Sequence, residues 1–172
     1  MATATHNLIQ SNLLLLRQAL DLLQRAGDYA YSAIPEGFAP HRAGGHLRHI
    51  LEFYECFLEG LPSLHIAYDA RRRDHAVEMS RAAAAEKTFA ILRRLETCAD
   101  LRGDATLWVR EDAGDYYLES SVNRELQALT SHTIHHFALI ALTLRLHGVD
   151  MDAEFGMAPS TLRYLQARAE AA

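Results

Sequence analysis

The chain has 172 residues, 49% of them hydrophobic, and a formal net charge of −5. This length and composition predict a single domain, residues 1–172, with a hydrophobic core of its own. The negative charge disfavours nucleic acid as a partner, because a phosphate backbone is bound by a basic surface. The leucine run of residues 13–16 is far too short to cross a bilayer. We therefore expect a cytoplasmic protein with no membrane partner.

Two amphipathic helices are predicted in the first half of the chain. Residues 5–26 carry leucine and isoleucine at the i, i+3/i+4, i+7 recurrence of a helix, and Gly27 is a plausible stop. Residues 28–42 contain two prolines and a glycine, which predicts a long connection. Residues 43–60 again have one apolar and one charged side, and Pro62 ends this second helix.

The second half of the chain predicts two more long helices. Residues 74–98 are rich in Ala, Glu, Arg and Leu at helical spacing. TLWVRED and YYLESSV, two β-prone runs separated by Ala113-Gly114-Asp115, then predict a small hairpin or an extended loop. A fourth helix is expected over residues 121–147, and Pro159 opens a short terminal helix. Four long helices of this kind predict an all-α fold, an antiparallel four-helix bundle.

The fourth predicted helix contains a cluster of histidines, SHTIHHFALI. On a helix that advances about 100° per residue, His132 and His136 point towards the buried face one turn apart, whereas His135 points away. Such a pair has the geometry that metal ligation needs. Two ligands bind a divalent ion weakly, so a third is required from another helix. The second predicted helix offers His46 and His49, in the sequence HLRH.

The spacing HxxxH is by itself a weak signal for a metal site. Helices carry two histidines four residues apart by chance, and an inward histidine is more often a hydrogen-bonded residue of the core. A facing helix with histidines of its own favours the interpretation as a metal site over the interpretation as packing. Both interpretations stay open at this point: a three-histidine metal site, or imidazole rings used as packing.

Several longer runs are more specific. GGHLRHILEFYE on the second predicted helix, together with SHTIHHFALI on the fourth, resembles the DinB-like superfamily, which comprises damage-inducible DinB proteins and related thiol transferases. The runs YDARRR (residues 68–73), NREL (residues 123–126) and FGMAPST (residues 155–161) extend the resemblance over most of the chain. It implies a metal-binding four-helix bundle of an uncharacterised branch.

The resemblance also implies the ligands and the chemistry of the site. The matching residues are the pair His132 and His136 with His49, the later histidine of HLRH. A helical wheel places His46 nearer the middle of the apolar side, so His46 remains the alternate third ligand. Zinc or nickel suits imidazole ligands, with iron and manganese as alternatives. Several members of the family use a low-molecular-weight thiol to join or rearrange small molecules, and members often pair as homodimers, so both are expected here.

Three arginines are candidates for binding the carboxylates of a thiol cofactor. A guanidinium forms paired hydrogen bonds with a carboxylate, and Arg71, Arg73 and Arg124 lie in the runs that carry the resemblance. A solvated turn and ordinary ion pairs with Glu125 or Asp74 are the simpler interpretation.

Two classes of function follow from these observations. The first is a metal-dependent enzyme, a thiol-dependent transferase or a hydrolase that acts on a small molecule. The second is a non-catalytic metal-binding protein of stress response or protein interaction. The sequence singles out no catalytic residue. It contains no GxGxxG, P-loop or GxSxG pattern, which removes the main support for dinucleotide, ATP and serine-hydrolase chemistry.

Overall fold

Helices account for most of the chain in the computed structural model, which describes residues 4–98, 101–111 and 114–170. The predicted helical character is confirmed, and a small sheet accompanies it. The helices are α1 (Ala4–Arg25), α2 (Asp28–Ser32), α3 (Ala43–Gly60), α4 (His75–Met79), α5 (Arg81–Glu96), α6 (Val122–Leu146) and α7 (Pro159–Glu170), with 3₁₀ turns η1 (Leu61–Ser63) and η2 (Tyr68–Ala70). The strands are β1 (His65–Ala67), β2 (Thr106–Arg110) and β3 (Leu118–Ser121).

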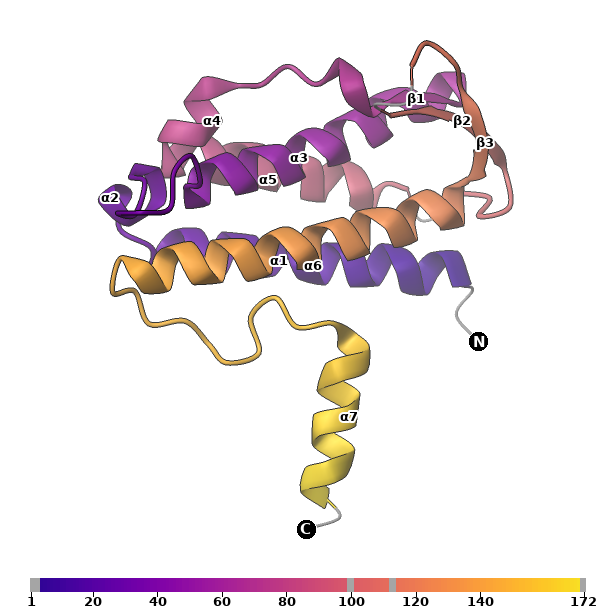
Figure 1. Ribbon diagram of the computed structural model, residues 1–172. Helices are drawn as coiled ribbons and strands as arrows, with labels where there is room; N and C mark the ends of the chain where they lie inside the picture. Colours follow the sequence, from indigo (N-terminus) through magenta and orange to yellow (C-terminus); the bar gives the residue numbers. More distant parts are fainter. Residues whose placement is uncertain (1–3, 99–100, 112–113, 171–172) are drawn as a thin grey trace.

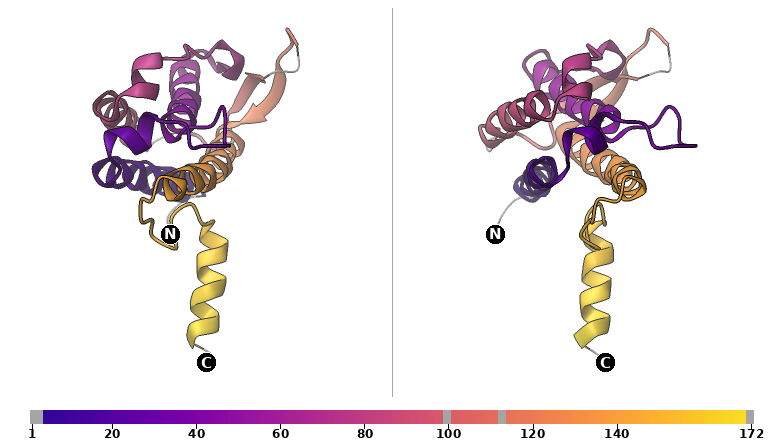
Figure 2. Two further views of the ribbon diagram at one scale, coloured as in Figure 1. Left: turned by 60° about the vertical axis from the view of Figure 1, so that its left-hand side comes forward. Right: turned by 90° about the vertical axis from the view of Figure 1, so that its left-hand side faces the viewer.

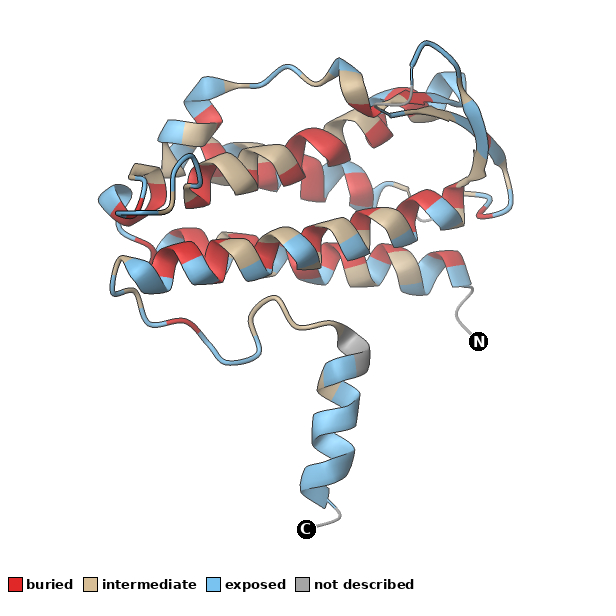
Figure 3. Ribbon diagram, in the orientation of Figure 1, coloured by how far each residue is buried: buried red, intermediate tan, exposed pale blue. Residues whose placement is uncertain are grey.

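The core lies among the four longest helices. α1 packs against α5 and α6, and α3 packs against the same two helices (Figure 1). Their buried residues face one another across the interior (Figure 3), as the apolar recurrence predicts. Leu16, Leu47 and Phe137 are among the largest fully buried side chains and come from α1, α3 and α6. None of the helices in the described ranges is long and apolar enough to cross a membrane.

The small sheet lies at one end of these helices (Figure 1). β2 and β3 form an antiparallel hairpin in which Trp108 is paired with Glu119, so the predicted hairpin is present. β1 joins β2 in parallel, with His65 opposite Trp108. Periodicity did not predict β1, because it has three residues and its partner lies about 40 positions further along the chain. Ala113, in the predicted turn, lies outside the described residues.

Two predicted boundaries need correction. The single helix expected over residues 74–98 is two helices, because Ser80 has extended backbone angles and its hydroxyl accepts a hydrogen bond from the backbone N–H of Ala83. A serine whose side chain caps the N-terminus of one helix also ends the helix that precedes it. The connection over residues 28–42 also contains a helical turn, α2, which starts directly after Gly27.

α7 stands apart from the other helices. It extends from the segment after α6 and points away from the rest of the molecule in all three views (Figures 1 and 2). Most of its surface is exposed (Figure 3), including the apolar side chains of Tyr164 and Leu165.

A buried hydrogen-bond network joins α1, α3 and α6. The hydroxyl of Tyr54 on α3 donates to Oδ1 of Asn12 on α1 over 2.7 Å and accepts from the hydroxyl of Thr133 on α6 over 3.2 Å. The amide of Asn12 also donates to the backbone carbonyl of Leu126, over 3.0 Å. All three polar side chains are at most 1% exposed. Because each buried polar group has a partner, the network fixes how far the three helices are shifted along one another.

Replacement of Tyr54 by Phe tests this network. The variant keeps the ring but leaves the Asn12 carbonyl without its side-chain donor, so we expect the free energy of unfolding to fall by about 1–3 kcal/mol. Chemical denaturation followed by circular dichroism measures the change. Tyr29→Phe is the control, since Tyr29 is 75% exposed; equal stability of the two variants would contradict the role of the network.

Candidate metal centre

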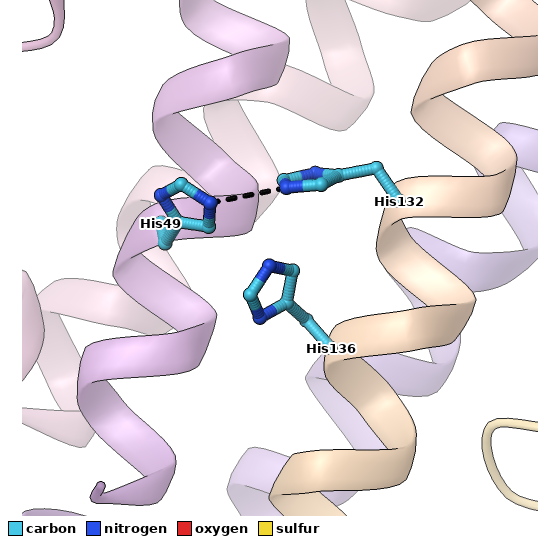
Figure 4. Close-up of side chains that lie close together, drawn as sticks. All are labelled: His49, His132 and His136. Atoms are coloured by element: carbon cyan, nitrogen blue, oxygen red, sulfur yellow. Dashed lines mark hydrogen bonds between the residues drawn. The ribbon is translucent and has the colours of Figure 1, made fainter.

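Three histidines from two helices converge on one point between α3 and α6. His49 lies on α3, and His132 and His136 lie one turn apart on α6 (Figure 4). Each offers one ring nitrogen, and these three nitrogens all lie within 4.8 Å of one another. The three rings are also evenly spaced, with centroid separations of 4.5 to 4.8 Å. The structure therefore brings together the three residues that the resemblance implies as metal ligands.

The nitrogens that face the centre are identified by the contacts of the rings. Nε2 of His49 lies 3.0 Å from Nε2 of His132 (dashed in Figure 4). His136 directs one nitrogen towards these two rings (Figure 4), and its Nδ1 is engaged elsewhere, 3.0 Å from Nδ1 of His46. The Nε2 atoms of all three histidines are thus the natural donor set.

This donor set fits a divalent transition-metal ion. Zinc and its neighbours are commonly bound by neutral imidazole nitrogens, and three such ligands leave further positions for water or substrate. Within the described residues, no carboxylate or thiol joins the group of three. Nδ1 of His132 is buried and has no hydrogen-bond partner in the described ranges. An unpaired buried polar atom is costly, and ligation through Nε2 leaves a proton on this Nδ1 without an acceptor among the described residues.

Burial keeps these imidazoles in the form that binds metal. It is the largest cause that lowers the pKa of His49 to about 3, followed by the positive charge of Arg71. Burial likewise lowers the pKa of His136 to about 3, with neighbouring histidines adding to the effect. The pKa of His132 falls to about 4, again through burial first. At neutral pH the three rings are neutral, as ligation requires.

The same pKa shifts predict an acid-sensitive fold for the metal-free protein. The unfolded chain binds protons at these histidines near pH 6.5, whereas the folded chain binds them only near pH 3 to 4. Between those pH values the unfolded state binds more protons than the folded state, so the free energy of unfolding decreases as the pH falls. Urea denaturation at a series of pH values measures this slope, and the triple variant with glutamine at positions 49, 132 and 136 should have a shallower one. Identical slopes would contradict the burial of neutral rings.

His46 lies beside the group of three and is not part of it. Its Nδ1 contacts His136 from the side opposite the centre, and its Nε2 lies 3.2 Å from Nδ1 of His41. The helical wheel favoured His46 as an inward residue, but the structure brings His49 to the two histidines of α6. The polar centre is displaced from the middle of the apolar side of α3, which explains the difference.

Arg71 approaches the centre from outside. One of its terminal nitrogens contacts Nδ1 of His49, and its guanidinium lies over the ring of Phe53, 5.0 Å from the ring centroid. A guanidinium only donates hydrogen bonds, so Nδ1 of His49 accepts. In this arrangement Nε2 of His49 carries the proton and donates to His132. A metal bound at Nε2 needs the other tautomer, which requires Arg71 to leave Nδ1.

A pocket of about 760 Å³ adjoins one of the three histidines, His132. It lies between the β2–β3 hairpin and the start of α6, and His132 forms part of its wall. Its apolar side comes from Phe53, on which His132 packs with a centroid separation of 4.1 Å. The remaining lining residues are Tyr68, Val109, Glu111, Leu118, Glu119, Ser120, Ser121, Arg124, Glu125, Ala128 and Leu129.

A buried carboxylate forms the base of this pocket. Glu125 accepts hydrogen bonds from the hydroxyls of Tyr68, over 3.0 Å, and Ser120, over 2.5 Å. Both residues lie outside α6, so the hydrogen bonds tie the first turn of α6 to η2 and to the hairpin. Sequence reasoning missed this role of Glu125 and the lining role of Phe53. The only sequence signal for these roles was that Glu125 lies in the run NREL and Phe53 in the run HILEFYE.

The three candidate arginines have different environments. Arg124 lines the pocket and is exposed, and within the described residues its side chain has no ion pair. Arg71 contacts His49 instead of Asp74, and Asp74 is paired with Lys87 over 3.1 Å. Arg73 is exposed and has no ion pair among the described residues. The structure thus brings Arg71 and Arg124 near the centre or its pocket, but not Arg73.

Comparison with known proteins adds one similarity. No protein-family model and no solved structure matches the chain. The FK506-binding protein 5 of Rhizopus delemar is 34% identical to it over 105 residues, which cover 58% of this chain and 27% of that protein. The chain thus matches about a quarter of that relative. The relative's name says that it binds FK506, and this is said of the relative only.

Proposed function

We propose that the chain is a divalent-metal-dependent enzyme of the DinB-like superfamily, a thiol-dependent transferase or a hydrolase that acts on a small molecule. The proposed architecture is the antiparallel four-helix bundle of that superfamily. In support, α1, α5, α3 and α6 contact one another in a closed ring, each with its two neighbours. The site between α3 and α6 is then a site in the bundle interior, which is where such folds hold metals.

The position of His132 carries the proposal. Its ring belongs to the three-histidine group and also to the wall of the pocket. A ligand in the pocket would therefore lie directly beside the bound ion. A structural metal site has four protein ligands and is closed, whereas three ligands next to a pocket is the arrangement of a catalytic site.

Distinct roles follow for the residues around the site. His49, His132 and His136 would hold the ion, zinc or nickel by preference. When bound, such an ion polarises a substrate and lowers the pKa of a coordinated water or thiol. Arg124 is placed to pair with an acidic group of a substrate or thiol at the pocket mouth. Phe53 and Leu129 exclude water from the apolar side of the pocket.

A pocket-filling variant tests this function. Metal-loaded protein is assayed with a panel of low-molecular-weight thiols and a chromogenic electrophile, and with chromogenic esters. Ala128→Phe should fill the pocket while all three histidines are kept, so we expect full metal content and loss of turnover. Gln127→Phe is the matched control, because Gln127 is exposed and does not line the pocket.

Three outcomes are informative. Turnover in wild type and Gln127→Phe but not in Ala128→Phe would support a catalytic site in the pocket. Equal turnover in all three proteins would place the reaction elsewhere. Metal-loaded wild type without turnover on either panel would favour a non-catalytic metal-binding protein.

We also propose that two copies of the chain pair, as members of the family do. The exposed apolar side chains of Tyr164 and Leu165 on the projecting α7 are consistent with such pairing. Light scattering in solution should return about twice the chain mass. A mass near 19.3 kDa would contradict the dimer.

A further inference from the structure

Two additional histidines continue from the metal centre towards the surface. Nδ1 of His136 lies 3.0 Å from Nδ1 of His46, and Nε2 of His46 lies 3.2 Å from Nδ1 of His41. The rings of His41 and His46 are parallel within 4°, with centroids 5.2 Å apart. His46 is half-buried and His41 is exposed. The three rings form a row from the centre to solvent, linked by nitrogen-to-nitrogen contacts throughout.

The chemistry of imidazole restricts how this row can be protonated. A neutral ring has one nitrogen that donates a hydrogen bond and one that accepts. If Nε2 of His136 binds a metal, its proton resides on Nδ1, and Nδ1 of His46 must accept it. Nε2 of His46 then carries a proton and donates to Nδ1 of His41. Every ring nitrogen at the two contacts has a complementary partner in this arrangement.

We propose that His46 is a positioning residue that holds His136 in its metal-binding tautomer and orientation. The inference rests on the proposed three-histidine metal site and deepens it. Histidine ligands generally donate their second N–H to a carboxylate, carbonyl or water, and loss of that partner costs about 10- to 100-fold in metal affinity. Here a second histidine provides the acceptor. In the same arrangement Nδ1 of His41 accepts from the other nitrogen of His46.

The other two ligands lack such an acceptor. Nδ1 of His132 is buried with no partner among the described residues, and Nδ1 of His49 is contacted by the guanidinium of Arg71, which only donates. Within the part of the chain that the structure describes, His136 is the one ring of the three whose Nδ1 has a neighbour able to accept a hydrogen bond. His136 is therefore the ligand that the metal-free fold already prepares, and the effect of replacing its partner should be large.

Zinc affinity measured against a competing chelator tests the proposal. Asn at position 46 places an oxygen where Nδ1 of His46 lies, whereas Leu has a similar shape and no acceptor. We expect zinc affinity to drop about 10- to 100-fold in His46→Leu and to stay close to wild type in His46→Asn. His135→Leu is the matched control, because the His135 ring packs edge-on against His136 without a nitrogen contact and is exposed; it should bind zinc like wild type. Thermal unfolding without zinc checks that all three variants fold.

A spectroscopic measurement reports the tautomer directly. In zinc-loaded protein with ¹⁵N-labelled histidine, long-range ¹H–¹⁵N spectra should show His136 protonated at Nδ1. Zinc affinity of His46→Leu equal to wild type, or His136 protonated at Nε2, would overturn the proposal. If His46→Asn loses zinc as completely as His49→Ala does, His46 is a ligand and the positioning role is wrong. Wild type that binds no zinc would refute the proposed function itself, and the positioning role with it.

Discussion

The relative position of α3 and α6 is the constraint on which the site depends, and the buried network around Tyr54 sets it. Tyr54 lies on α3 beyond His49, and Thr133, which donates to it, directly follows His132 on α6. A shift of one helical turn between the two helices would separate the hydroxyls and move His49 away from its two partners. The packing that stabilises the fold therefore also aligns the three imidazoles. The buried polar groups find their hydrogen-bond partners in only one alignment of the two helices, whereas apolar packing tolerates other alignments. The polar network therefore makes the alignment specific.

Burial gives the centre its chemical character. Each histidine is only partly exposed, and burial is the main reason that its pKa is low. The fold thereby holds three neutral imidazoles together, and no carboxylate of the described residues joins the group to balance an ion. A cation bound there brings its own positive charge next to Arg71, and the pocket supplies acidic side chains at Glu111, Glu119 and Glu125.

Local patterns in the sequence predicted much of this arrangement. The spacing of His132 and His136 places them one turn apart on any helix, and the apolar recurrence located the long helices within a few residues. The choice between His46 and His49 could not be made by periodicity, because it depends on where α6 crosses α3. The resemblance to a family supplied that information, and the structure brings His49 into the group.

Features made by contacts distant in the sequence were not predictable in the same way. The pairing of β1 with β2 and the pocket between the hairpin and α6 depend on segments some 40 to 70 positions apart. The hydrogen bond from Tyr68 to Glu125, which lies 57 positions further along the chain, is of the same kind. The break at Ser80 was local but missed, since the residues on both sides have high helix propensity and only the capping hydroxyl ends the first helix.

The central claim is that His49, His132 and His136 bind a metal ion, and the metal content of the purified protein tests it most directly. Protein without a histidine tag would be analysed by mass spectrometry before and after reconstitution, as wild type, His49→Ala, His136→Ala and His46→Ala. The account predicts close to one ion per chain in reconstituted wild type, its loss in His49→Ala and His136→Ala, and retention, with weaker binding, in His46→Ala. Wild type that takes up no metal even after reconstitution would contradict it, and the three histidines would then be packing residues.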